Sequence, residues 1–163
     1  MSEYIEIKGL ENFFKVCDKL IDMDKHGQSI MAGTGESIRN SIIDSFKNER
    51  SIFDGKWKSL KPATIKQKIK EGKNKGILKR DGELSNALNW QSEPTKSGVK
   101  VFNNIQSKSG FKYGLVHQYG SRKKNIPARS FLPIDNNNNV LHQSIRSVIY
   151  KDTKDFIVKI AKK

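Results

Sequence analysis

The segment that decides the fold runs from residue 111 to residue 132 and reads Phe-Lys-Tyr-Gly-Leu-Val-His-Gln-Tyr-Gly-Ser-Arg-Lys-Lys-Asn-Ile-Pro-Ala-Arg-Ser-Phe-Leu. Two tyrosines and a valine recur in it at every third position: Tyr113, Val116 and Tyr119. That spacing predicts one short helical turn that buries these three side chains. His117 and Gln118 are then expected to point away from the buried side.

A basic loop follows this turn. Gly120 is expected to end the helix, because glycine adopts the positive φ that other residues resist. Three bases come next: Arg122, Lys123 and Lys124. Pro127 restricts the residue before it to an extended conformation. The apolar pair Phe131 and Leu132 then predicts an anchor that returns the segment to a core.

Arg129 lies in this loop between a proline and a phenylalanine. An arginine held in this way is suited to a bidentate bond with a carboxylate or with carbonyl oxygens. We expect that bond to form within the subunit, and a bond to a neighbouring subunit is the alternative. His117 is expected to supply a hydrogen bond that locks the loop before Arg129.

The segment resembles the phage virion morphogenesis family, the tail-completion proteins of tailed phages and prophages. The resemblance covers roughly residues 29–132. It rests on linked motifs in the family's order: Tyr113 to Gly120, Ile126 to Leu132, Gly55 to Leu60 with Thr64 and Lys68, and Ile77-Leu78 followed by Gly82-Glu83-Leu84.

The resemblance implies a non-enzymatic structural or assembly protein that completes the tail or joins it to the head, as a ring. It implies no cofactor, and other phage tail or neck proteins as partners. The location implied is the host cytoplasm during assembly and then the virion tail or neck, with a monomer possible in isolation. A small basic nucleic-acid-binding protein is the alternative. A metal nuclease using His117 with Asp135 is a third class, and the sequence shows no acidic cluster to hold its ion.

The net charge is +14, from 31 Lys and Arg against 17 Asp and Glu. Such a basic balance indicates an acidic or polyanionic partner, and lysine-rich coding in an AT-rich genome is the plain alternative. No apolar run approaches the roughly 20 residues that span a bilayer. The acidic start is unlike a signal peptide, so no membrane association is expected.

Apolar spacing predicts the helices of the first half of the chain. A short strand over residues 4–7 and an amphipathic helix over residues 9–22 come first, and the polar stretch that follows is expected to end that helix. Its single cysteine, Cys17, is expected to be a small buried residue rather than a reactive thiol. A longer helix over residues 29–48 follows, in which two glycines allow close packing unless Thr34 caps a fresh start.

Turn-forming residues and the alternation of apolar with polar residues predict the secondary structure of the rest of the chain. Asp54-Gly55 predicts a turn, and Pro62 begins a short helix with Ile65 and Ile69 on its apolar side and lysines on its other faces. A helical turn at Leu84 and Leu88 leads to a hairpin of residues 89–92 and 99–103. A last helix carries Leu141 to Ile149, with Asp135 as its expected cap, and residues 156–160 fit a helix or a strand.

Together these elements predict one domain over residues 1–163, of the α+β class. A small antiparallel sheet with a central hairpin is expected to pack against two or three longer amphipathic helices.

Trp57 is expected to anchor the core locally, with an exposed contact as the alternative. Two sets of side chains are candidates for partner contacts. The assembly set comprises Trp57, His117, Gln118, Arg122, Lys123, Lys124 and Arg129. The set that would face DNA or an acidic partner comprises Lys66, Lys70, Lys73, Lys75 and Arg80.

Overall fold

The computed structural model describes residues 15, 17–18, 23–73, 76–135 and 140–162. The predicted strand over residues 4–7 and most of the predicted helix over residues 9–22 lie outside them. The elements in chain order are α2 (Met23–Asn48), β1 (Arg50–Ser51), β2 (Gly55–Lys56), α3 (Pro62–Lys70), the 3-10 turn η1 (Ala87–Asn89), β3 (Gln91–Pro94), β4 (Val99–Phe102), α4 (Tyr113–Tyr119) and α5 (Gln143–Ala161).

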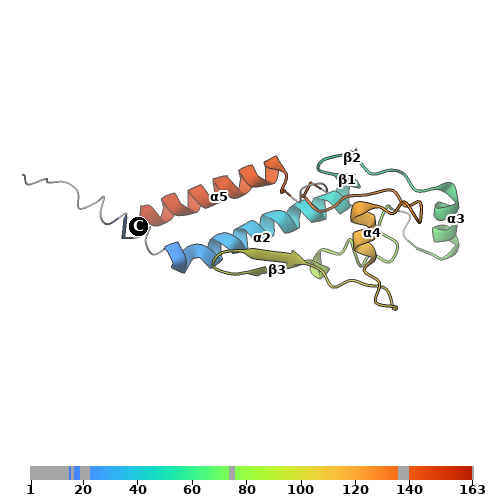
Figure 1. The fold of residues 1–163 in the computed structure, drawn as a ribbon, viewed down its shortest axis with the longest axis horizontal. Coiled ribbons are helices and arrows are strands. Elements are labelled where there is room, and N and C mark those ends of the chain that lie inside the picture. The colour runs from blue at the N-terminus through green and yellow to red at the C-terminus, as the bar shows by residue number, and fades with distance from the viewer. Residues whose placement is uncertain (1–14, 16, 19–22, 74–75, 136–139, 163) are drawn as a thin grey trace, which may run out of the picture.

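The helix α2 is the axis of the described structure. Figure 1 shows α5 running back along α2 on one side, while the β3–β4 hairpin lies along the other. The short helices α3 and α4 gather beyond the hairpin, away from the end of α5. This confirms the α+β class with a hairpin packed against helices. The strands form two separate two-stranded ladders, β1 with β2 and β3 with β4.

The start of α2 corrects a prediction. The polar residues before Ser29 were expected to lie outside the helix, but α2 begins at Met23. The alternative of a new start at Thr34 is also wrong, because its Oγ1 donates to the carbonyl of Ile30 at 3.1 Å within a continuous helix. A hydroxyl satisfied by the preceding turn does not cap a helix.

Gly35 is where the hairpin approaches α2. A Cβ at this position would lie 2.0 Å from Ser92 Oγ and 2.8 Å from Val99 Cγ2. A Cβ at Gly33 would have no atom within 4 Å. Close packing is therefore required at one of the two predicted glycines, and it is the hairpin that packs there rather than another helix.

The β3–β4 hairpin is confirmed, and it begins later than predicted. Gln91 pairs with Phe102 and Pro94 with Val99. The residues before it form η1, whose start is capped by the Asn86 side chain accepting from the N–H of Leu88 at 3.0 Å. The capped turn replaces the helical turn expected at Leu84 and Leu88.

The core lies where α2, β2 and the segment after α4 meet. Phe46 packs against Trp57 and Phe131, with ring centroids 5.6 Å and 5.0 Å away. Trp90 reaches the other side of Phe131 at 5.8 Å. Both indole N–H groups are satisfied, Trp57 by the carbonyl of Ser130 and Trp90 by that of Leu84. The aromatic cluster therefore joins segments that lie far apart in the sequence.

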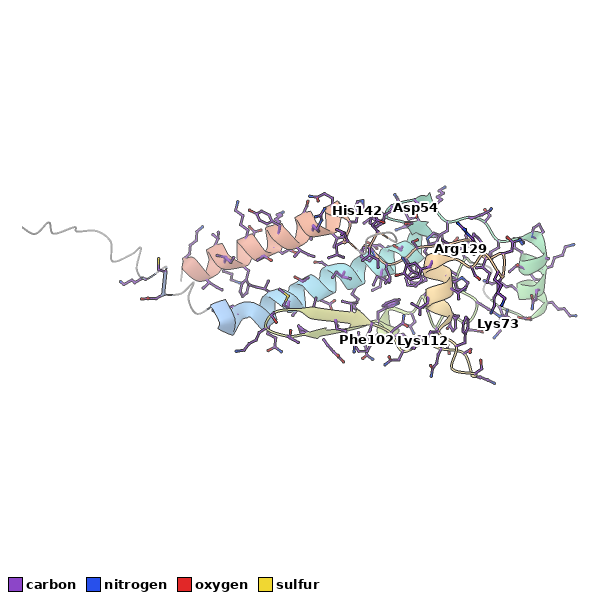
Figure 2. The ribbon with its side chains drawn as sticks, viewed as in Figure 1. Asp54, Lys73, Phe102, Lys112, Arg129 and His142 are labelled. Carbon is purple, nitrogen blue, oxygen red and sulfur yellow. The ribbon has the colours of Figure 1, made fainter. Side chains whose placement is uncertain are left out.

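The C-terminal part resolves one alternative and corrects one prediction. Residues 156–160 belong to α5 and are helical. The cap of α5 is His142, whose side chain accepts from the N–H of Ser144 at 3.2 Å, and not Asp135. The backbone N–H of Asp135 donates to the carbonyl of Val140 instead, and Ile134 and Leu141 next to this pair form an antiparallel bridge. Figure 2 shows His142 close to the turn that carries Asp54.

Within the described residues, no helix combines the length and the apolar character needed to cross a membrane.

Candidate docking site

The helix α4 is present as predicted, but it buries a different side. Tyr119 is 48% exposed, whereas Gln118 is fully buried. The Oε1 of Gln118 accepts two backbone N–H groups, from Phe131 at 2.9 Å and from Leu132 at 3.0 Å. Buried backbone donors need a partner, and this need turns the glutamine inward and leaves the tyrosine outside.

A tight basic turn leaves the end of α4. Gly120 has a φ of 76°, as expected of the residue that ends this helix. Ser121 and Ile126 then pair through two backbone bonds, of 2.8 Å and 2.9 Å. The residues between them form the tip of the turn and are exposed: Arg122, Lys123, Lys124 and Asn125.

Arg129 holds this turn to the chain beyond β2. Its Nε donates to the carbonyl of Lys58 at 2.9 Å, and its Nη2 donates to the carbonyl of Ser59 at 3.3 Å. The predicted bidentate bond therefore forms within the subunit, to carbonyls. The side chain lies beside α4 (Figure 2) and is buried, and burial lowers the pKa of its guanidinium.

His117 locks the loop through its backbone rather than its ring. Its carbonyl accepts the N–H of Arg129 at 2.7 Å. The ring Nδ1 is buried and has no hydrogen-bond partner among the described residues. Burial, and then the charge of Arg129, lower the pKa of His117. The imidazole is therefore neutral at pH 7. No group of three or more His, Cys, Asp or Glu side chains suited to a metal ion occurs in the described part of the chain.

The helix α3 is present as predicted. Ile65 and Ile69, on its apolar side, are 36% and 53% exposed. Lys68, on another face, is 5% exposed, and its Nζ donates to the carbonyl of Gly76 at 2.7 Å. Burial, followed by the charge of Arg80, lowers the pKa of Lys68. A lysine hydrogen-bonded inward therefore anchors α3 and leaves its apolar stripe exposed.

The other candidate residues divide into three groups. Trp57 is in the core, as its local-anchor interpretation predicted. Lys66 and Lys70 are exposed on α3. Two bases pair with acids: Lys73 with Asp81 at 2.6 Å, and Arg80 with Glu71. Lys75 lies outside the described residues.

Two adjoining hollows border the segment Ile126–Arg129. One, of about 490 Å³, opens toward Tyr119 and Arg122. The other, of about 350 Å³, opens toward α3 and His117. We call the pair the loop groove. Both hollows share five lining residues: Lys61, Asn125, Ile126, Pro127 and Arg129.

Sequence reasoning missed the part that Lys61 plays in this groove. It immediately precedes Pro62, so its backbone is extended and it stands just before the first turn of α3. That position is the only local signal, because another wall of the groove comes from distant residues, between 117 and 129. Arg39 was also missed: it donates to the carbonyls of Trp90 and Ala87, both at 2.9 Å, and joins α2 to η1.

Fold and site together define a class: a small basic α+β protein whose most constrained loop is exposed and held by internal hydrogen bonds. The chain belongs to the phage virion morphogenesis family, whose model matches residues 6–152. Membership assigns it a structural or assembly part in building phage particles. The chain is also 44% identical over 79 residues to an uncharacterised protein of Methanocaldococcus jannaschii, a match covering 47% of this chain and 54% of the relative. The chain thus spans about half the length of that curated relative. No solved structure matches it at a comparable level of significance.

Proposed function

We propose that this protein completes the phage tail or joins it to the head, as a non-enzymatic ring bound to other tail or neck proteins. The observation that carries the proposal is the construction of the loop after α4. Gln118 and Arg129 use their side chains to fix its backbone. The bases at its tip are left exposed. Such pre-organisation lowers the entropic cost of docking.

Exposed apolar side chains near the same end of the molecule support an assembly role. Ile65 and Ile69 on α3 and Leu115 on α4 are each more than a third exposed. Exposed apolar side chains that lie together mark an interaction surface, although others are exposed on α5, at Val148, Tyr150 and Val158. The proposal places the contacts with neighbouring virion subunits at the side chains of α3 and α4.

Charge limits how the ring could form. A ring of six copies would carry six times +14, or +84, and would repel itself strongly unless acidic partners or DNA neutralised it. The proposal therefore predicts a monomer in isolation and a ring on the tail. A closed ring of the isolated protein at low salt, without any added anion, would contradict this account of the charge.

The test is a mass measurement in solution across ionic strength, with and without purified tail tubes of the phage that carries the chain. Electron microscopy of the tube ends would detect the ring. The informative variant replaces Arg122, Lys123 and Lys124 with Gln, and its matched control replaces Lys151, Lys154 and Lys159, which are exposed on α5. Loss of tube binding in the first variant alone supports the proposal. Unchanged binding in both, or equal loss in both, contradicts it.

One contact favours the nucleic-acid-binding alternative. Lys124 Nζ lies 5.0 Å from the centre of the Phe111 ring, and that ring is 45% exposed. An exposed aromatic beside basic residues is a stacking platform for a base. This function predicts micromolar affinity for DNA with a steep dependence on salt, reduced by Phe111→Ala. Salt-independent or undetectable binding would exclude it.

A further inference from the structure

The charged side chains that line the loop groove are all basic. None of the side chains lining either hollow is an Asp or a Glu. The lining cations are Lys58, Lys61, Lys68, Arg80, Arg122 and Arg129. Among the described residues, Lys61 and Arg122 form no ion pair, and Arg129 meets only carbonyl oxygens. By contrast, a third hollow, which shares Leu78, Arg80 and His117 with the groove, is also lined by Asp81 and Glu83.

Gathering these charges is unfavourable in the free protein. Burial is the largest cause that lowers the pKa of Lys68; Arg80 and Arg129 lower this pKa further, while Glu49 and Asp81 act in the opposite direction. The charge of Arg129 also opposes protonation of His117. An anion in the groove would relieve this repulsion, because opposite charges in a partly buried site attract more strongly than in water.

The shape and lining of the groove indicate which kind of anion fits. Its walls include apolar surface from Leu60, Leu78, Ile126 and Pro127, and Tyr119 stands at its edge. A duplex presents phosphates on a convex backbone with no apolar side chains. A protein segment with alternating acidic and apolar residues matches both features of the groove. A second copy of this chain would add +14 to the complex, so charge favours a different, acidic protein.

We propose that the loop groove is the receptor for an acidic, partly apolar segment of another virion protein, whose carboxylates bind Lys61, Arg122 and Arg129. This inference rests on the proposed function, because it names the chemistry of the partner at that docking site. Lys61 and Arg122, which both line the larger hollow, bind the carboxylates, while Ile126 and Pro127 contact the apolar side chains of the segment.

The test uses the isolated full chain and a fluorescent eight-residue peptide of alternating Glu and Leu. The double variant Lys61→Gln with Arg122→Gln is compared with Lys66→Gln with Lys70→Gln, which has the same net charge and leaves the groove intact. We expect the groove variant to weaken binding about tenfold, the effect of roughly 1.4 kcal/mol, and the control to bind as the parent does. A peptide of alternating Ser and Leu should not bind.

His117 provides a second readout within the parent protein. A carboxylate bound nearby favours the protonated imidazole, so saturating Glu-Leu peptide should raise the pKa of His117 measured by NMR. Equal loss of affinity in the groove and control variants would overturn the proposal. Binding of a short DNA duplex that is lost selectively in the groove variant would also overturn it, as would a homo-oligomer that only this variant dissociates.

The outcome is separable from that of the proposed function. Groove-specific peptide binding without attachment to tail tubes would support the acidic-segment receptor and contradict the tail role. If the groove variant still attaches to tail tubes and the parent protein does not bind the peptide, the tail role would be supported and the acidic-segment receptor contradicted.

Discussion

The side-chain oxygen of Gln118 accepts the backbone N–H of Phe131 at 2.9 Å, and both residues are buried. The same oxygen also accepts the N–H of Leu132. One glutamine of α4 thereby determines the path of the chain where it enters the aromatic core. The exposed basic turn between them is fixed at both ends by this arrangement.

Replacing Gln118 with Met should destabilise the protein by about 2–5 kcal/mol, because two buried N–H groups lose their acceptor. Denaturant unfolding measures the change. Gln67→Met on the exposed surface of α3 is the control and should stay within about 0.5 kcal/mol. Equal effects of the two substitutions would show that the Gln118 bonds contribute little.

Replacing Arg129 with Lys should lower the stability of the monomer by about 1–3 kcal/mol, because an ammonium does not reproduce the planar fork that reaches two carbonyls. Thermal and denaturant melts test this, with Arg122→Lys in the exposed turn as the control. An unchanged melt combined with lost assembly on tail tubes would assign Arg129 to an intersubunit contact instead.

The two glycines of α2 should respond oppositely to alanine. Gly33→Ala should stabilise the protein by about 1 kcal/mol, since alanine is the better helix former and the site is open. Gly35→Ala should destabilise it by about 1–3 kcal/mol, because the new methyl group meets Ser92 and Val99. Denaturant unfolding of both variants measures these changes. A stabilised Gly35→Ala protein would mean that the hairpin does not lie against α2 as described.

His117 should make stability depend on pH. Burial lowers its folded-state pKa below the unfolded value of 6.5, so the unfolded chain binds more protons in the interval between the two. Stability is therefore complete above the unfolded pKa and decreases as the pH falls through it toward the folded pKa. Melting temperatures from pH 7.5 to pH 5 should show this decrease, and His117→Gln should reduce it. A decrease unaffected by His117→Gln would contradict the assignment.

Local pattern was sufficient for much of the fold. The four-residue steps of Ile38, Ile42 and Phe46 predicted α2. The alternation around Val99 and Val101 predicted the hairpin, and Gly120 predicted the end of α4. Each of these depends on contacts within a few residues or on the steric preference of a single residue, so no knowledge of distant segments was needed.

The orientation of short helices could not be obtained in this way. In α4, periodicity predicted that Tyr119 would be buried, but Gln118 is buried instead; in α3, the buried side chain is Lys68 and not one of the apolar side chains. Each of these polar side chains meets a backbone group from elsewhere: the N–H of Phe131 for Gln118 and the carbonyl of Gly76 for Lys68. The spacing of apolar residues carries no information about hydrogen-bond partners that lie far away in the sequence.

The sequence by itself therefore determined the approximate positions of α2, α3, α4 and the hairpin, the excess of positive charge, and the motifs of the family. Only the tertiary structure decided which sides of α3 and α4 are buried and that Arg129 binds the carbonyls of Lys58 and Ser59. It also decided that Lys61 and Arg122 border one groove. The physical reason is range: local conformation follows from neighbouring residues, whereas a buried polar group takes whichever partner the folded chain brings to it.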